Sequence, residues 1–146
     1  MTRARRFSAL LLAALLAATL VTPASAAESE RTVIDLGNGF YVVETIIPGP
    51  MTRAGDSTAG TKMATRYQGS TLIGTATLVA VFDISGSTAK ATMASVSGTG
   101  SNGGAYSRGT TSCSGNTAYG TAYFTYSGVE RNLTITLSCS PDGTLS

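Results

Sequence analysis

The sequence predicts an all-β fold, either a single antiparallel β-sandwich of about seven strands or a small barrel. Beyond residue 26 the chain is rich in Thr, Ser, Gly, Tyr and Val and poor in charge, a composition that favours pleated strands and tight turns. Turn signals recur between short alternating segments, and no stretch there has a helical period. About 120 residues are enough for one hydrophobic core, so we expect residues 27–146 to form one domain.

The first segment, residues 1–26, is typical of a secretory signal peptide. A basic start precedes an apolar run from Ala9 to Val21, and its roughly 13 residues fall short of the ~20 that a membrane-spanning helix needs. Small residues around Ser25 form an A-x-A pattern, which predicts cleavage after Ala26, with Ala27 as the alternative. We therefore expect a secreted, extracellular protein without membrane attachment after processing, exported by either the Sec or the twin-arginine route.

Charge argues against a nucleic-acid or anionic-membrane partner. Three of the ten basic residues lie in the leader and all eight acidic residues follow it, which leaves seven basic against eight acidic residues in the processed chain. No run of Lys or Arg occurs in that part, so the basic footprint that such partners require is absent.

The first elements follow from turn residues. Gly37-Asn38-Gly39 predicts a tight turn, and Phe40–Ile47 is apolar on nearly both faces, as in a strand inside a sandwich. Pro48 and Pro50 are expected to end that strand. Residues 48–60 lack periodicity and are expected to form an exposed connection.

Three further strands are expected between residues 61 and 97. In Thr61–Gln68, alternation predicts that Met63, Thr65 and Tyr67 face inward and that Lys62, Ala64, Arg66 and Gln68 face water. The long segment Thr71–Ile84 places one apolar set on a single face: Leu72, Ala76, Leu78, Ala80, Phe82 and Ile84. After Ser85-Gly86-Ser87, a strand from Thr88 is expected to face inward with Ala89, Ala91 and Met93.

The last third of the chain predicts a glycine-rich loop and three strands. Residues 98–109 have the composition of a flexible loop. The strands are Thr110–Ser114, Thr117–Ser127 and Val129–Cys139, with Gly115-Asn116 and Ser127-Gly128 as turns.

Cys113 and Cys139 are the only cysteines, and we expect them to form one disulfide, as is usual in an exported protein. Cys139 follows Leu133, Ile135 and Leu137 at alternate positions, so it should point into the core. A zinc site would need more ligands, and the chain has no histidine. A redox pair would normally be C-x-x-C. Neither metal nor cofactor is expected.

Catalysis has little support in the sequence. The absence of histidine excludes Ser-His and Cys-His nucleophile pairs, and the carboxylates are isolated from one another. Glu44 interrupts an apolar strand, so a carboxylate-dependent hydrolase built on Glu44, with Glu130 as a conceivable second acid, stays as a minor hypothesis. The alternative is a surface carboxylate paired with an arginine. We expect the protein not to be an enzyme.

Tyr119 and Tyr123 are candidate ligand-binding residues. They are four apart in a predicted strand and therefore share a face, where they could form an aromatic platform for sugar rings. The alternative is that they cover a hydroxyl-rich sheet or fill its core.

Several segments together resemble a family of small exported bacterial Thr/Ser-rich β proteins of unknown function. The similarity covers the processed chain and rests on "DLGNGFYVVET", "GSTAKAT", "SCSGNTAYGTA" and the closing "LSCSPDGTLS". The resemblance implies export and a β framework, and it supplies no catalytic or binding residues.

The leading functional hypothesis is a non-enzymatic extracellular binding module, with a polysaccharide, a small molecule or another protein as ligand. The alternative is a secreted effector, either an antimicrobial protein or an enzyme inhibitor, that makes its contacts through residues 48–60 and 98–109.

Overall fold

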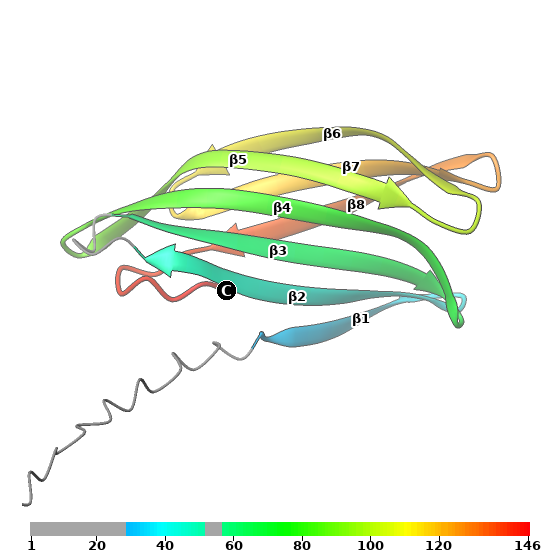
Figure 1. Ribbon diagram of the computed structural model, residues 1–146, viewed down its shortest axis with the longest axis horizontal. Coiled ribbons are helices and arrows are strands. Elements are labelled where there is room, and N and C mark those ends of the chain that lie inside the picture. Colours follow the sequence, from blue (N-terminus) through cyan, green and yellow to red (C-terminus); the bar gives the residue numbers. More distant parts are fainter. Residues whose placement is uncertain (1–28, 52–56) are drawn as a thin grey trace, which may run out of the picture.

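The computed structural model describes residues 29–51 and 57–146, and the leader with its expected cleavage site at Ala26 or Ala27 lies outside them. Within those ranges the chain forms eight strands and no helix, so the all-β prediction is confirmed (Figure 1). No helix in this part is therefore long and apolar enough to cross a membrane. The strands are β1 Arg31–Gly37, β2 Phe40–Met51, β3 Ser57–Gln68, β4 Thr71–Ser85, β5 Thr88–Gly100, β6 Gly104–Ser114, β7 Thr117–Tyr126 and β8 Val129–Ser138.

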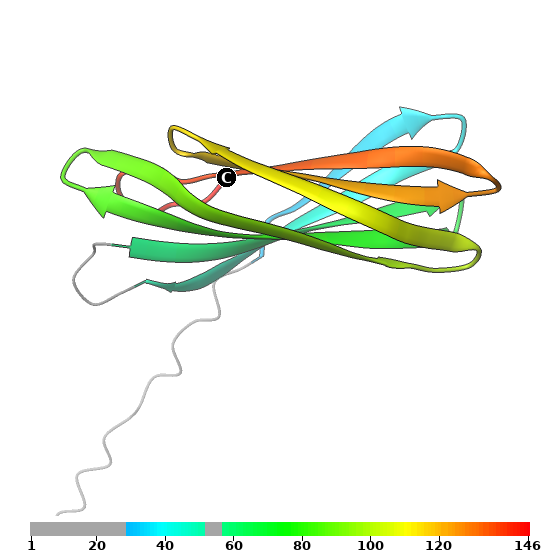
Figure 2. The same cartoon turned by 90° about the horizontal axis from the view of Figure 1, so that it is seen from above.

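The strands form two antiparallel sheets in simple chain order. One sheet has the order β1-β2-β3-β4-β5 and the other β6-β7-β8. The smaller sheet lies behind β3 to β5 in the view of Figure 1, and Figure 2 shows the two layers from above. Chain contacts between the sheets run from β5 against β6 and β7 to β3 against β8. The sandwich is thus closed along the β5–β6 side and open along β8, where β1 and β2 extend past the smaller sheet.

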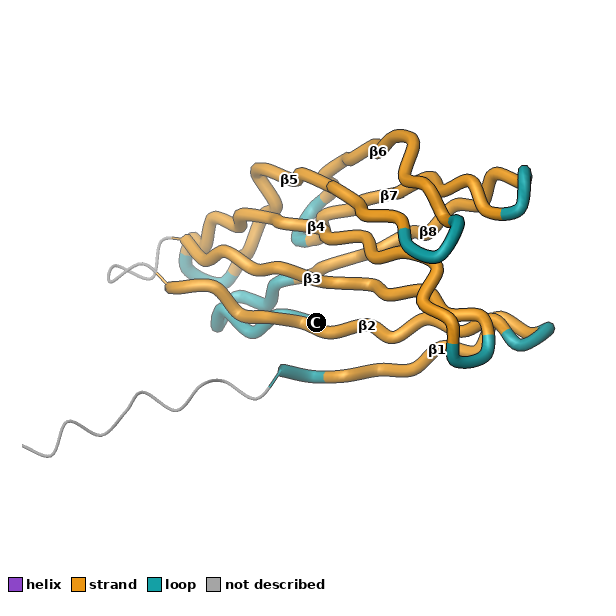
Figure 3. Tube along the Cα trace, turned by 45° about the vertical axis from the view of Figure 1, so that its right-hand side comes forward, coloured by secondary structure: helices purple, strands orange, loops and turns teal. Residues whose placement is uncertain are grey.

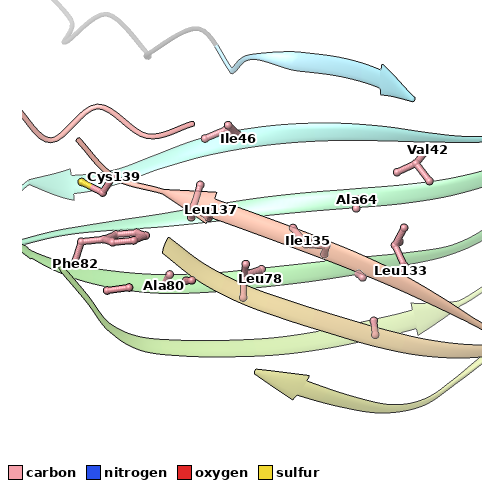
Figure 4. Close-up of a cluster of buried hydrophobic side chains, with 14 of the residues drawn as sticks. Val42, Ile46, Ala64, Leu78, Ala80, Phe82, Leu133, Ile135, Leu137 and Cys139 are labelled. Carbon is pink, nitrogen blue, oxygen red and sulfur yellow. The ribbon is translucent and has the colours of Figure 1, made fainter. Parts of the chain in front are cut away.

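The core lies between β4 of the large sheet and β7 and β8 of the small one (Figure 4). Leu78 and Phe82 on β4, and Ile135 and Leu137 on β8, are all fully buried, so the predicted inward faces are confirmed for β8 and for β4 from Ala76 onward. The prediction is wrong for Leu72, because Ile73 is an extra residue in β4 that places Leu72 opposite Tyr67 and is itself buried in its stead. Small residues on the facing strands let the sheets approach. A side-chain carbon at Gly120, for example, would lie 2.9 Å from Leu78 Cδ1.

β1 is an eighth strand that the sequence prediction of about seven did not include. It pairs with β2 from Arg31 opposite Thr45 to Asp35 opposite Tyr41, and the predicted turn follows with Asn38 at φ 54°. All seven residues of β1 are exposed. Because neither face is buried, the strand lacks the clear alternation of apolar and polar residues by which strands are found in sequences.

The prolines do not end β2, and that prediction is wrong. The strand continues to Met51, with Pro48 opposite Gly60 on β3 and a bulge before Met51. Pairing with β1 stops at Thr45, so beyond it β2 has a neighbour on one side only. A proline is tolerated there because its missing N–H can face the unpaired side. The expected exposed connection is correspondingly wrong for 48–51 and 57–60, which are strand residues.

The inward face of β3 is the opposite of the predicted one. Ala64 and Arg66 are buried, whereas Met63 and Tyr67 are only partly so. The register explains this, because Ala64 lies opposite Ala76, and Ala76 belongs to the buried face of β4. Side chains directly opposite each other share a face of the sheet, so the even-numbered residues of β3 must point inward.

On β5, Ala91 is buried as expected, but Met93 is 58% exposed and points outward. Val81 pairs with Met93 while Phe82 pairs with Ala91, so Thr92 is an extra residue in β5. Such a bulge reverses the faces of all residues that follow it. The next inward residues are Ala94 and Val96.

The expected loop at residues 98–109 is also wrong, because β5 runs to Gly100 and β6 begins at Gly104. The turns lie mainly at the two ends of the sandwich (Figure 3). The glycines in this segment permit close packing rather than disorder. A side chain at Gly98 would collide with the ring of Tyr106, and one at Gly100 with the carbonyl of Gly104.

Candidate functional site

Tyr119 and Tyr123 lie on the outer face of the small sheet, opposite Thr136 and Asn132 of β8. Tyr119 is 38% exposed. The ring of Tyr123 is covered on one side by the guanidinium of Arg108, whose central carbon lies 3.8 Å from the ring centre. The two tyrosines therefore do not form an open pair of stacking surfaces.

Arg66 is the most unusual polar side chain in the described part of the chain. Its position on β3, opposite Val42 on one side and Gly74 on the other, turns it toward the interior. It is only 8% exposed, and its Nε has no hydrogen-bond partner among the residues that the structure describes. Burying a guanidinium group without a full set of partners is costly, so its retention there needs a reason.

Arg131, at the start of β8, brings a second guanidinium to the same place. The central carbons of Arg66 and Arg131 lie 5.1 and 5.3 Å from the centre of the Phe40 ring. Aromatic rings attract cations at this distance, so Phe40 holds both groups. Burial, and secondly the charge of Arg131, lower the pKa of Arg66 from its ordinary value. The pair thus forms a site of concentrated positive charge.

A groove of about 550 Å³ adjoins this pair. It runs across the free edge of β8, from residues that point between the sheets to residues on the outer face of the small sheet. Its lining consists of Leu36, Arg66, Tyr123, Glu130, Arg131 and Asn132. Leu36 belongs to β1, which with β2 extends past the smaller sheet. The groove therefore opens beside β8, where these two strands have no facing strand.

The charges around the groove are unequal. Arg108 stands beside it and forms an exposed salt bridge of 3.4 Å with Glu130, the one acidic side chain among the described residues that line the groove. Neither Arg66 nor Arg131 has a salt bridge to any residue that the structure describes. Three of the five arginines beyond residue 26 therefore gather at one groove, with one carboxylate between them. Such an arrangement suits a ligand that carries a negative charge.

Glu44 lies elsewhere, on the inner face of β2. Its Oε2 is 3.0 Å from Nζ of Lys62, and both side chains are largely buried. The partner is a lysine rather than the arginine considered above. Glu44 and Lys62 line a second, smaller cavity with Glu30, whereas Glu130 lines the arginine groove. The structure therefore does not bring Glu44 and Glu130 together as an acid–base pair.

The expected disulfide is absent, and both cysteines are free thiols. Cys113 on β6 lies opposite Ala118 of β7, whose other neighbour is Leu137 of β8, so β7 separates the two cysteines. Two strand intervals of about 4.8 Å place β6 and β8 about 10 Å apart, beyond the roughly 7 Å between Cα atoms that a disulfide can span. Cys139 is fully buried, as predicted, while Cys113 is exposed.

The thiol of Cys139 is buried and hydrogen-bonded. It donates a hydrogen bond to the carbonyl of Ser140 at 3.3 Å. Burial, with a smaller contribution from Asp142, raises its pKa. Within residues 29–51 and 57–146, no cluster of three or more Cys, Asp or Glu side chains could hold a metal ion.

Sequence reasoning missed the arginine site because it assigned Arg66 to the water-facing set of β3. No clear signal within β3 corrects this, because the face that carries Gly60 and Ala64 also carries the charged residues Lys62 and Arg66. Phe40 and Arg131 come from strands remote in the chain, and only the folded structure places them beside Arg66.

Comparison with known proteins gives no further guide. The chain matches no protein-family model, no curated protein and no solved structure.

Proposed function

We propose that the chain is a non-enzymatic extracellular binding module whose ligand is an acidic glycan, held by its carboxylate or sulfate groups in the arginine groove. The single observation that carries the proposal is Arg66, which is buried beside Arg131 and whose Nε has no hydrogen-bond partner in the described part of the chain. An anion in the groove would offset both the burial of the charge and the repulsion between the two guanidinium groups.

The surface that continues from the groove favours a sugar over a simple anion. Beyond Asn132 the outer face of the small sheet carries rows of hydroxyl groups and Tyr119. Thr121 and Thr134 lie opposite each other with their hydroxyls 3.4 Å apart, and Thr117 and Ser138 with theirs 2.9 Å apart. Hydroxyls and a tyrosine ring suit the polar edges and flat faces of sugar residues.

Two alternatives have less support. The effector hypothesis relied on contacts from residues 48–60 and 98–109, and most of those residues are in β2, β3, β5 and β6. The hydrolase hypothesis relied on Glu44, whose carboxylate is held by Lys62.

The test is calorimetric titration of the protein with oligogalacturonate, with an uncharged galactose oligomer of the same length as the second probe. We expect the acidic oligomer to bind and the neutral one to bind at least tenfold more weakly, with affinity falling as salt increases. Arg66→Met and Arg131→Gln should each lower the affinity at least tenfold. Lys90→Gln is the matched control, since Lys90 is an exposed cation on β5, remote from the groove.

Equal affinity for the two oligomers would remove the acidic glycan from the proposal. Unchanged binding in the Arg66→Met, Arg131→Gln double variant would show that the groove is not the site. Binding of inorganic sulfate alone, without the oligomer, would reduce the site to one for small anions.

A further inference from the structure

The edge of β1 is open for pairing with another strand. β1 is the outermost strand of the large sheet, and its neighbour β2 lies on one side only (Figure 1). Natural proteins usually protect such an edge with charges, prolines or bulges that discourage pairing. β1 carries two charges, Arg31 and Asp35, and a register shift after Asp35, yet it also exposes a row of apolar residues: Val33 at 62%, Ile34 at 40% and Leu36 at 47%.

The hydrogen bonds show which residues of β1 offer their backbone groups to the free side. The amide of Ile46 donates to the carbonyl of Glu30 at 3.1 Å, directly beyond the pair of Arg31 and Thr45. In an antiparallel ladder, opposite residues alternate between pairs that exchange hydrogen bonds and pairs that do not. Thr32 and Ile34 therefore bond to β2, and Arg31, Val33 and Asp35 direct their N–H and C=O groups outward.

The charges in β1 are arranged symmetrically about Val33. Arg31 lies two residues before it and Asp35 two residues after it. If a second β1 pairs antiparallel about Val33, each Arg31 lies directly opposite an Asp35 of the other copy. Opposite charges in directly opposed positions stabilise a strand pair. The neighbouring register, centred on Ile34, would place Asp35 opposite Val33 and leave Arg31 opposite Gly37.

We propose that two copies of this chain associate through β1, with Val33 opposite Val33 and Arg31 opposite Asp35, so that the two large sheets become one continuous sheet. The same three residues that carry the free backbone groups then supply the hydrogen bonds, the charge pairs and the central apolar contact. The symmetry axis is perpendicular to the joined sheet, so both arginine grooves lie on the same side of it. The proposal does not depend on the ligand.

The first test is sedimentation equilibrium of the purified protein and of Val33→Pro. The amide of Val33 faces outward, so a proline there should leave the fold of one copy intact while removing the central hydrogen bonds of the dimer. We expect a dimer whose dissociation constant rises at least tenfold in Val33→Pro, with an unchanged melting temperature of the single copy. A wild-type protein that stays monomeric, or a Val33→Pro variant that dimerises as tightly as the wild type, would overturn the proposal.

The second test fixes the register. In a Cys113→Ser background, Val33→Cys should form an intermolecular disulfide under mild oxidation, because opposite residues of an exchanging pair have Cα atoms about 5.5 Å apart, within disulfide range. Ile34→Cys in the same background is the matched control, since it lies opposite Thr32 of the other copy in the proposed register. Efficient cross-linking at Ile34→Cys instead of Val33→Cys would overturn the register.

Discussion

Arg66 and Arg131 place their guanidinium groups 5.1 and 5.3 Å from the centre of the same ring, that of Phe40. Two like charges are thus held together in a partly enclosed place, and neither has a salt-bridge partner among the residues that the structure describes. Because a buried charge without a partner is costly, we expect this arrangement to stabilise the folded chain less than an apolar residue would.

Arg66→Met should stabilise the protein. The substitution removes a buried cation with an unpaired Nε and its repulsion with Arg131, and we expect a gain of about 1–2 kcal/mol in the free energy of unfolding. Urea unfolding followed by tyrosine fluorescence measures it. Lys90→Met, at an exposed site, is expected to change the same quantity by less than about 0.5 kcal/mol. A loss of stability in Arg66→Met would mean that the contact with Phe40 outweighs the cost of burial.

The two thiols should differ strongly in reactivity. Cys113 is exposed, whereas Cys139 is fully buried and has a raised pKa. The thiolate is the reactive form, so Cys139 should react with iodoacetamide only when the protein unfolds. Intact mass spectrometry of the native protein should show one rapid alkylation, and of the denatured protein two. The Cys113→Ser variant should show no rapid step, and a native mass lower by two protons would contradict the free thiols.

The ion pair between Glu44 and Lys62 should be sensitive to removal of one partner. Glu44→Gln or Lys62→Met leaves the other group largely buried without its counter-charge, and we expect a loss of about 3 kcal/mol in the free energy of unfolding. The double replacement by Leu and Met should restore most of the loss. Glu130→Gln, which breaks the exposed pair with Arg108, is the control and should cost less than about 1 kcal/mol. Equal losses in both pairs would contradict the role of burial.

The turn near the C-terminus should respond to acid through Asp142. Hydrogen bonds from the hydroxyl of Ser140 and the amide of Thr144 lower the pKa of Asp142 from 3.8 to about 2. Since the pKa is lower in the folded state, the stabilisation is complete above pH 3.8 and is lost as the pH falls through about 2. NMR titration of the Asp142 carboxyl carbon and the Thr144 amide should show one common midpoint near 2. In Asp142→Asn the Thr144 amide should not titrate, and a midpoint near 4 in the wild type would be contrary to the hydrogen bonds.

The inward face of a strand is predictable where its apolar residues recur at every second position. In β8 the apolar residues through Ile135 alternate with polar ones, and in β4 Leu78 and Phe82 share a face with alanines while valines occupy the other, so these inward faces follow from period two. β3 carries Met63 and Tyr67 on one face and Ala64 and Arg66 on the other, and its side-chain chemistry does not indicate the correct face. Pairing with Ala76 of β4 decided it.

The predicted loop at residues 98–109 and the predicted disulfide are both wrong because they depend on how strands pack, which local sequence does not show. Glycine composition predicts a loop from Gly98 onward, yet Gly98 and Gly100 lie in β5, at places where neighbouring groups come too close for a side chain. Cys113 and Cys139 point to the same side of the small sheet, as alternation predicts for Cys139. Their separation across β7 depends on strand order, which the spacing of two cysteines in a chain does not reveal.

The sequence by itself determined the all-β class, the positions of the tight turns, and the apolar faces of the strands at the centre of the core. These depend on residues that are close in the chain, and short-range sterics and alternation act at that distance. The tertiary structure alone decided the arginine groove and the open edge of β1. A bulge reverses the faces of every later residue in a strand, as at Thr92, and alternation along the chain does not show where such a bulge lies. The neighbours of Arg66 come from strands that are remote in the sequence, so they are set only by the packing of β1, β3 and β8 against one another.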